Sequence, residues 1–346
     1  MNQKSRWYHS PNAIAYIYRL MKPEYTLEEI KRPVTLELKA FDAHFRQAMQ
    51  SRVALLDQIS YYLVKTKGKQ LRPLMSLLSA KLFGEINEKT FAAATLVELL
   101  HTATLVHDDV VDESDQRRGF FSIKALWKNK IAVLVGDYLL SRGLLTALQG
   151  SHFDLLEILS SSVSEMSEGE LLQLEKARRL DINEAIYFQI IRQKTASLIR
   201  SACLCGAKST TDQLDYLNNI RDYGEKIGIA FQIKDDLMDL SKDFTGKPKI
   251  LDIKEKKMTL PLIAALTKAP LPLKNRMISL IRNHNENPKS IQEVVSFIHE
   301  YNGIETAEQK MYAYRDEALA HLQNLPHNDA HEALVKLSYY ITSRVK

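Results

Sequence analysis

Two stretches of the chain carry acidic side chains at a spacing that could bind metal ions. Each ends an apolar run with the pattern Asp-Asp-x-x-Asp, at 108–112 and again at 235–239. In a helix, the first and last aspartates of each pattern share one face about 5–6 Å apart, where like charges repel. Hard carboxylate oxygens suit Mg2+, which commonly bridges carboxylates to substrate phosphates. The candidate metal ligands are Asp108, Asp109, Asp112, Asp235, Asp236 and Asp239.

The repetition of this pattern is more informative than either copy alone. A single Asp-Asp-x-x-Asp occurs by chance and more often marks a solvated acidic helix end than a metal site. Here both copies follow apolar segments, and both have basic residues a short way downstream. Two such clusters facing each other would form a diphosphate-binding cavity.

Basic side chains occur where they could hold phosphate groups. Lys69 and Arg72 lie in a short segment bracketed by glycine and proline, without an acidic neighbour. A lysine offers a point charge and an arginine a planar fork, which together suit a diphosphate, although a solvated turn has the same composition. Arg117 and Arg118 leave the first Asp cluster on a predicted non-helical segment. Their side chains should therefore diverge toward two different phosphates.

Three further polar residues interrupt apolar helical runs. Lys194 and Thr195 lie in one of these runs, and a buried lysine is costly unless it is paired, so this lysine invites an anion. His101 lies seven residues before Asp108, two turns away on nearly the same face. A lone histidine on an apolar helix is more often a core residue, but this alignment favours a contact with the ligand.

The composition predicts an all-α protein. Of 346 residues 45% are hydrophobic, and 12 Gly and 10 Pro leave few chain breakers for hairpins. No internal domain boundary is visible, so we expect a flexible N-terminal tail at 1–25 and a single domain at 26–346, folded as a large helical bundle around a central cavity. Helical periodicity predicts helices at 27–49, 53–64, 74–83, 90–107, 131–148, 155–179, 187–205 and 215–240.

Charge and cysteine content limit the partners and the compartment. The net charge of +5 comes without a block of Lys or Arg, so no nucleic-acid partner is expected. Cys203 and Cys205 have no second pair, which predicts core thiols in a reducing compartment, the cytoplasm, rather than a zinc site or disulfides. The apolar stretch 131–148 is interrupted by Gly, Asp and Arg, so we expect a buried helix, not a transmembrane span. Peripheral membrane contact stays open.

Six motifs in order resemble those of the trans-isoprenyl diphosphate (polyprenyl) synthases. They are Gly-Lys-x-x-Arg-Pro at 68–73, the first Asp cluster, Arg-Arg-Gly at 117–119, Gly-Asp at 136–137, Lys-Thr at 194–195 and Phe-Gln-x-x-Asp-Asp at 231–236. The resemblance runs from about residue 36 to the C-terminus and is strongest to long-chain bacterial members, which supply quinone side chains. It implies a homodimeric, Mg2+-dependent prenyltransferase of the isoprenoid synthase fold. The expected substrates are an allylic diphosphate, farnesyl or similar, and successive isopentenyl diphosphates.

The resemblance also implies roles for individual residues. Direct ligands of about three Mg2+ ions would be Asp108, Asp112 and Asp235, with Asp109, Asp236 and Asp239 nearby or bridged by water. The isopentenyl diphosphate site would consist of Lys69, Arg72, His101 and Arg118. The allylic diphosphate site would consist of Arg117, Lys194, Thr195, Gln232 and Lys257. No protein nucleophile is required, because catalysis would rest on positioning and electrostatics in a dry pocket.

Product length should depend on the helix that precedes Asp108. The growing tail would pass Ala103 and Thr104, one of which is typically aromatic in short-chain relatives, and then Leu100 and Val97. None of these four is aromatic. We therefore expect a long channel and a hexaprenyl to octaprenyl product, which Ala103→Phe should shorten.

The sequence departs from the family pattern in two loops. Lys67 and Gln70 stand where the family commonly has Gly and Arg, and Ile250, Leu251 and Lys256 stand where its last loop commonly has small residues or Gly. Losing glycines removes conformations with positive φ.

Two other functions stay open. A class I terpene cyclase shares the fold and the first motif, but its second metal motif would read Asn/Asp-Asp-x-x-Ser/Thr-x-x-x-Glu, unlike 235–239. A non-catalytic subunit of a heteromeric prenyl synthase would keep the fold but lose an Asp cluster, whereas both are intact here.

Overall fold

The computed structural model describes residues 25–117, 119–240 and 250–344. The predicted tail 1–25 lies outside this part except for its last residue, and Arg118 also lies outside it. The N-terminal helices are α2 (Leu27–Lys31), η2 (Arg32–Val34), α3 (Thr35–Met49), α4 (Ala54–Lys65), α5 (Leu71–Phe83) and α6 (Glu88–Val111). After the strands β1 (Gln116–Arg117) and β2 (Phe120–Phe121) come α7 (Ile123–Gln149), α8 (Phe153–Arg179), α9 (Glu184–Ile191), η3 (Arg192–Ala196), α10 (Ser197–Lys208) and α11 (Leu214–Asp239). The C-terminal helices are α12 (Leu251–Lys254), α13 (Leu260–Lys268), α14 (Leu271–His284), α15 (Pro288–Glu300), α16 (Gly303–Leu322) and α17 (Asp329–Ser343).

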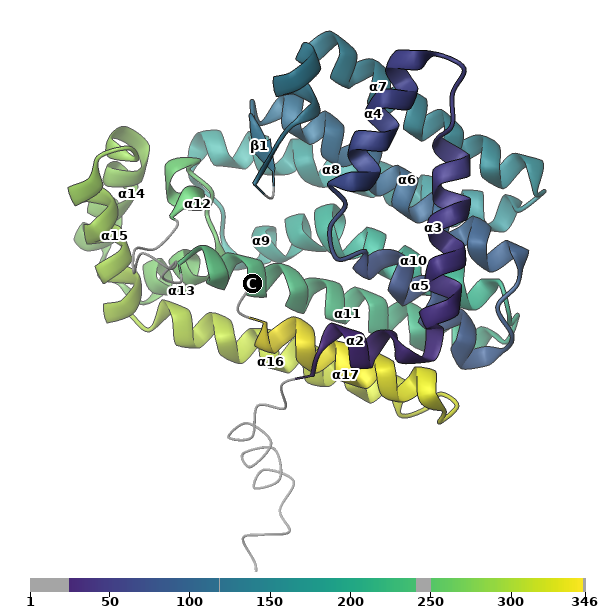
Figure 1. Cartoon of the computed structure of the whole chain (residues 1–346). Helices are drawn as coiled ribbons and strands as arrows, with labels where there is room; N and C mark the ends of the chain where they lie inside the picture. The colour runs from purple at the N-terminus through teal and green to yellow at the C-terminus, as the bar shows by residue number, and fades with distance from the viewer. Residues whose placement is uncertain (1–24, 118, 241–249, 345–346) are drawn as a thin grey trace, which may run out of the picture.

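The long helices form the centre of the bundle. Figure 1 shows α6, α8, α10 and α11 running through it, with α13 to α15 at one side and α16 and α17 along one edge. Most buried apolar side chains belong to one main core, and a smaller second cluster lies between α6, α7, α8 and α10. Cys203 and Cys205 are both free and fully buried, as predicted for core thiols. The all-α prediction is confirmed.

Several helix boundaries differ from those predicted. The segment 27–49 is not one helix, because Arg32-Pro33 forms a 3-10 turn between α2 and α3. Pro33 lacks an N–H donor and is therefore tolerated in the first turn of a helix but not in the middle of one. The segment 187–205 is divided by η3, a π-helix at 192–196. A two-stranded antiparallel hairpin, β1–β2, follows the first Asp cluster and was not predicted.

Lys128 adopts a backbone conformation that is almost restricted to glycine, with φ 73° and ψ 162° at a kink inside α7. Such a conformation costs about 1–3 kcal/mol for a residue with a Cβ atom. We expect Lys128→Gly to raise the free energy of unfolding by about 1 kcal/mol, because the strain relieved exceeds the entropy that glycine adds to the unfolded chain. Thermal or urea unfolding would measure this change.

Lys130→Gly is the matched control for this prediction. Lys130 is also exposed on α7 but lies beyond the kink. Glycine in a regular helix costs about 1 kcal/mol, so this variant should be less stable than the parent. A loss of stability in Lys128→Gly equal to that in Lys130→Gly would contradict the strain argument.

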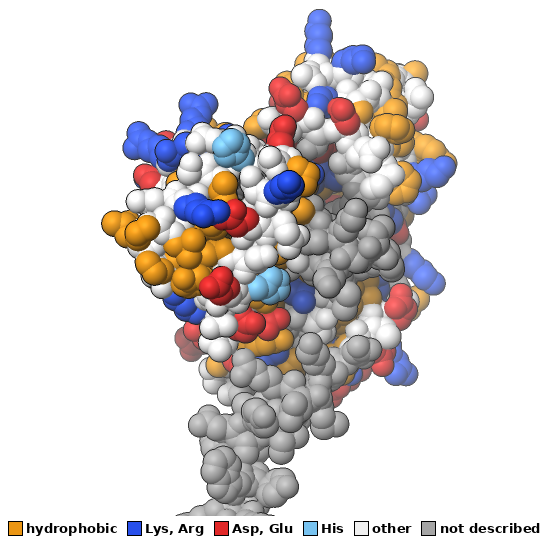
Figure 2. Space-filling model, turned by 90° about the vertical axis from the view of Figure 1, so that its left-hand side faces the viewer, with side chains coloured by type: hydrophobic (Ala, Val, Ile, Leu, Met, Phe, Trp, Pro, Cys, Tyr) orange, Lys and Arg blue, Asp and Glu red, His pale blue; other side chains and the backbone are white. Residues whose placement is uncertain are grey.

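The surface is mixed in charge, and one of its helices is apolar. Figure 2 shows the side of the molecule that carries α14 and α15, where basic and acidic side chains are interspersed.

Among the described residues, one helix, α7, is long and apolar enough to cross a membrane, and a third of that stretch is buried. A single helix of this kind is weak evidence for a span, because apolar helices at subunit interfaces have the same composition. The prediction that this segment is a buried helix is therefore only partly correct.

Candidate active site

A cavity of about 260 Å³ lies between α8, α9, η3, α11 and the segment that leads into α13. It brings together residues predicted from three separate segments of the chain: Lys194, Thr195, Gln232, Asp235, Asp236, Asp239 and Lys257. Its wall also contains apolar side chains such as Ile190, Ile191 and Met258. The second Asp cluster therefore faces cations and hydroxyl groups across a partly apolar cavity, as expected of a site for an anionic substrate with an apolar tail.

The first Asp cluster occupies the last turn of α6. Asp112 forms the C-cap of this helix, and Asp109 is 4% exposed and accepts a hydrogen bond from Arg117 Nε at 2.7 Å. Arg117 therefore contacts an aspartate of the cluster rather than standing apart from it. Burial raises the pKa of Asp108 to about 6, and nearby Lys194 opposes this shift. Lys194 thus connects the first cluster with the cavity that the second cluster lines.

A chain of hydrogen bonds fixes the second cluster. The Tyr187 hydroxyl donates to Asp236 Oδ2 at 2.7 Å, and the Gln232 side-chain amide donates to Asp236 Oδ1 at 2.9 Å. Gln232 in turn accepts a bond of 2.8 Å from the Thr195 hydroxyl. Burial raises the pKa of Asp236 to about 6, while these two donors oppose the rise. Sequence analysis missed Tyr187, although it lies seven residues before Lys194, at helical spacing.

A residue at the end of the chain also contacts the second cluster. Arg344 Nη2 lies 2.5 Å from Asp235 Oδ1, and the guanidinium stacks 4.0 Å from the centre of the Phe231 ring. Figure 1 shows the C-terminus beside α11. Burial raises the pKa of Asp235, and Arg344 opposes this shift. Nothing in the local sequence of Arg344 indicates this contact, because 109 residues separate the two partners.

Asp239 orders the segment that follows α11. Its carboxylate accepts hydrogen bonds of 3.1 Å from the backbone N–H groups of Leu251 and Asp252, at the start of α12. Lys257 pairs with Glu255, and its Nζ lies 4.0 Å from Asp252 Oδ1. Burial lowers the pKa of Lys257, but these acidic partners, together with Asp112, raise it overall. Lys257 therefore lines the cavity of the second Asp cluster and lies within electrostatic range of Asp112 in the first.

The departures from the family pattern do not prevent the required backbone shape. Ile250, Lys256 and Gln70 adopt the left-handed conformation, with φ of 50°, 58° and 53°. Leu251, in contrast, is the first residue of α12. Lys67 and Gln70 both contact Asp42 on α3, with Lys67 Nζ at 2.5 Å and Gln70 Nε2 at 3.2 Å from Oδ1.

Two glycines allow the helices around η3 to approach closely. A Cβ atom on Gly228 of α11 would lie 2.7 Å from the Ala196 Cα atom, and a Cβ atom on Gly169 of α8 would lie 2.8 Å from the Gln193 Cβ atom. These contacts set Gln232 beside Thr195 and Glu170 beside Lys194. The anion that pairs with Lys194 in this structure is the carboxylate of Glu170. A π-helical turn at this point is typical of functional sites.

The residues predicted for the isopentenyl site lie on α5 and α6 and just before α5. Arg72 belongs to the first turn of α5 rather than to a loop, and its Nη1 lies 3.0 Å from His101 Nε2. Lys69 Nζ lies 5.4 Å from the centre of the Tyr340 ring. A second cavity of about 80 Å³, lined by His101, Asp109 and Arg117 among others, opens between α4, α6 and the β1–β2 hairpin. Arg118 lies outside the described residues.

The donor set fits Mg2+ only together with a substrate. Among the residues of 25–117, 119–240 and 250–344, no three His, Cys, Asp or Glu side chains converge closely enough to hold a metal. The six aspartates nevertheless supply hard oxygen ligands from two separate helix ends. Mg2+ is usually bound by one or two carboxylates plus substrate phosphates, so a diphosphate between the clusters would complete its coordination.

Ionisation of the buried carboxyls should destabilise the protein when metal is absent. The pKa values of Asp108 and Asp236 are raised to about 6, and that of Asp252 to about 7, each chiefly by burial. The folded state therefore keeps protons that the unfolded state releases between about pH 4 and pH 7. In EDTA we expect the melting temperature to fall as the pH rises from 5 to 8, as measured by circular dichroism.

Asp252→Asn is the control for this prediction. Removing the ionisable group should flatten the pH dependence of the melting temperature, since the pKa of Asp252 is raised furthest. Each unit of pKa shift corresponds to about 1.4 kcal/mol, so the difference should reach a few kcal/mol. Mg2+ and pyrophosphate should flatten the wild-type curve as well. A melting temperature that rises over this window in EDTA would contradict the prediction.

Comparison with known proteins gives concordant similarities. A family model described as "Polyprenyl synthetase" matches residues 53–298. The chain is 33% identical over 320 residues to the octaprenyl diphosphate synthase of Escherichia coli (strain K12), covering 92% of this chain and 99% of that protein. The crystal structure of a decaprenyl diphosphate synthase from Rhodobacter capsulatus matches with a TM-score of 0.88 and 32% identity, covering 93% of this chain and 100% of that one.

A third similarity concerns a structure with bound metal. The polyprenyl synthase from Caulobacter crescentus CB15, complexed with calcium and isoprenyl diphosphate, matches with a TM-score of 0.86 and 32% identity, covering 94% of this chain and 100% of that chain. The matches thus span both Asp clusters and the cavity between the helices.

Proposed function

We propose an activity for this chain, which belongs to the polyprenyl synthetase family and is a prenyltransferase. It condenses an allylic diphosphate with successive isopentenyl diphosphates to a long-chain all-trans polyprenyl diphosphate, a quinone side-chain precursor. The observation that carries this proposal is the cavity in which the second Asp cluster faces Lys194, Thr195 and Lys257. Acidic and basic groups around one partly apolar cavity suit a metal-bound diphosphate with a prenyl tail.

The chain's own residues would bind and orient the two substrates. Lys194, Thr195, Gln232 and Lys257 line the cavity and would hold the allylic diphosphate. Arg72 and His101, which are in contact, would hold the isopentenyl diphosphate together with Lys69. The ion pair between Lys194 and Glu170 must weaken or break when the allylic diphosphate enters and binds Lys194.

The reaction follows from charge stabilisation at the departing diphosphate. Mg2+, held by Asp108, Asp112 and Asp235, would supply positive charge to the diphosphate oxygens. Lys194 and Lys257 add fixed positive charge on the same side, which favours breaking of the allylic C–O bond. The isopentenyl double bond then forms the new C–C bond at the allylic carbon, and a proton leaves to the pyrophosphate. Breaking of the C–O bond leaves positive charge on the allylic carbon. The apolar wall formed by Ile190 and Ile191 would keep water away from this allylic cation.

Three Mg2+ ions are proposed on the strength of the family pattern. Asp108 and Asp112 offer two carboxylates at the end of α6, and Asp235 offers a third on α11. Asp109 is hydrogen-bonded to Arg117, and Asp236 to Tyr187 and Gln232, which suits both to an orienting role beside the ligands. A cytoplasmic location is proposed as well, supported by the two free, buried cysteines.

A homodimer is proposed through α7, whose outer face is apolar. Its exposed apolar side chains are Leu126, Val133, Leu134, Leu144, Leu145 and Leu148. Exposed apolar side chains in this number along one helix commonly mark a subunit interface. We expect Leu145→Glu to convert dimers into monomers in light scattering. Leu271→Glu, which alters an exposed leucine on α14, should leave the mass unchanged. A dimeric Leu145→Glu variant would contradict this interface.

The activity is tested by incubating the purified protein with farnesyl diphosphate, labelled isopentenyl diphosphate and Mg2+, and separating the products by length. A ladder that ends well beyond geranylgeranyl is the expected result. Unlabelled cyclic or hydrocarbon products would instead identify a cyclase. Binding of both substrates without turnover would identify a non-catalytic subunit, and the search would then turn to its catalytic partner.

A further inference from the structure

The second hydrophobic cluster forms a column that runs away from the active site between four helices. Its buried members are Ala93, Leu96, Val97, Leu100, Ala147, Leu155, Leu159, Leu198, Ala202 and Cys205. They come from α6, α7, α8 and α10, and they are separate from the main core. We call this set the apolar column.

The upper end of the apolar column adjoins the active site. On α6, Leu100 lies two turns before Asp108. On α8, Met166 packs against the column and lies one turn before Glu170, the ion-pair partner of Lys194. A prenyl tail that starts at a diphosphate held by Lys194 therefore meets this column directly below the site.

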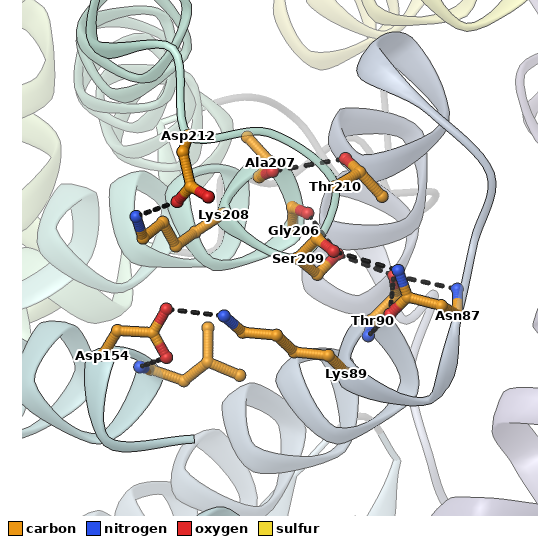
Figure 3. Close-up of polar contacts among 11 residues, drawn as sticks. Asn87, Lys89, Thr90, Asp154, Gly206, Ala207, Lys208, Ser209, Thr210 and Asp212 are labelled. Atoms are coloured by element: carbon orange, nitrogen blue, oxygen red, sulfur yellow. Dashed lines mark hydrogen bonds and ion pairs between the residues drawn. The ribbon is translucent and has the colours of Figure 1, made fainter. Parts of the chain in front are cut away.

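The lower end of the apolar column is closed by an ion pair. Lys89 Nζ lies 2.6 Å from Asp154 Oδ2, and Figure 3 shows these side chains reaching across from α6 to α8. Ala93 lies one turn above Lys89 on α6, and Leu155 directly follows Asp154 on α8. Burial raises the pKa of Cys205, a member of the column, and the nearby Asp154 carboxylate raises it further.

Further hydrogen bonds reinforce this closure on the side of α10. The hydroxyls of Thr90 and Ser209 lie 2.6 Å apart, and the Asn87 side-chain amide donates to the Ser209 carbonyl at 3.0 Å. Figure 3 shows these contacts beside the Lys89–Asp154 pair. We call the five residues Asn87, Lys89, Thr90, Asp154 and Ser209 the polar clasp. It ties α6 to both α8 and α10.

The two ends of the column are far apart, and four of its members are small. Lys89 and Asp108 are 19 residues apart on α6, about 28 Å along the helix axis. Ala93, Ala147, Ala202 and Cys205 are all small. The large apolar side chain beside the clasp is Leu155, which offers an apolar tail no charge, so the charged groups of the clasp are the barrier that we consider.

We propose that the Lys89–Asp154 ion pair is the floor of the prenyl channel and sets the maximum product length, an inference that rests on the proposed prenyltransferase function. An elongating tail can displace apolar side chains at little cost in solvation. It cannot pass between Lys89 and Asp154 without separating this ion pair and covering both charges with hydrocarbon, which is unfavourable. Elongation therefore ends when the tail reaches the clasp.

The test compares product lengths after the charges are removed together. The double variant Lys89→Ala/Asp154→Ala leaves no orphan charge, and it should still perform the first condensation and yield products longer by at least one isoprene unit. The exchanged pair Lys89→Asp/Asp154→Lys restores opposite charges and should return the product to the parental length. Products of parental length from a folded, active double variant would overturn the proposal.

Two further variants complete the test. Lys208→Ala/Asp212→Ala removes a neighbouring ion pair on the surface and should leave product length unchanged. Ala93→Phe fills the lower column while keeping the clasp, so it should shorten the product; an unchanged product would overturn the proposal even if the clasp variants do not fold. Failure of the parent protein to incorporate isopentenyl diphosphate at all would instead refute the proposed function.

Discussion

Asp108→Asn is expected to lower kcat/KM for condensation about 10³-fold. The substitution keeps the shape of the side chain but removes the charge that faces Lys194 and would bind Mg2+. Loss of one preorganised electrostatic contact at a transition state commonly costs 10² to 10³-fold, and a lost metal ligand adds to this. The measurement is the rate of incorporation of labelled isopentenyl diphosphate over a range of Mg2+ concentrations. The variant should also require more Mg2+ for half-maximal activity.

Asp115→Asn is the matched control for this substitution. Asp115 lies only three residues beyond Asp112, but its side chain is 75% exposed and pairs with Lys124 at the surface. Its replacement should change kcat/KM less than two-fold, since exposed ion pairs contribute little. If Asp108→Asn retained the parental rate and Mg2+ dependence, the first Asp cluster would not be the metal site.

Thr104→Phe is expected to shift the main product to a much shorter chain. Thr104 lies one turn before Asp108 and one turn after Leu100, on the face of α6 that carries the apolar column. A phenyl ring at this level would obstruct a tail before it reached Leu100 and Val97. Ala103→Phe should also shorten the product, but less, because Ala103 packs into the main core rather than the column. Chromatography of dephosphorylated products measures both shifts.

Leu105→Phe controls for a ring added at the same level of α6. Leu105 lines the smaller cavity beside the β1–β2 hairpin, on another face of the helix. Its replacement should leave the length distribution as in the parent, even if substrate affinity changes. Parental products from both Thr104→Phe and Ala103→Phe would rule out α6 as the wall of the channel.

The sequence by itself determined the fold class and indicated most of the candidate site, because both depend on local spacing. Apolar residues at helical periods predict α6, α8 and α11 closely, since amphipathic periodicity is a local property. Once each Asp-Asp-x-x-Asp pattern is helical, its first and last aspartates lie on one face of the helix. Lys194, Thr195 and Gln232 were identified by short motifs, and the structure brings all three to one cavity.

Only the tertiary structure decided which charges meet across helices. The contact of Arg344 with Asp235, the bond from Tyr187 to Asp236 and the pairing of Lys194 with Glu170 all join different elements. No local pattern specifies them, because they depend on close helix approach at Gly169 and Gly228 and on the path of the chain back to its C-terminus. The Lys89–Asp154 pair likewise joins two helices, α6 and α8, that packing brings together. Sequence thus specified the candidate site residues, and packing specified their partners and the cavity between them.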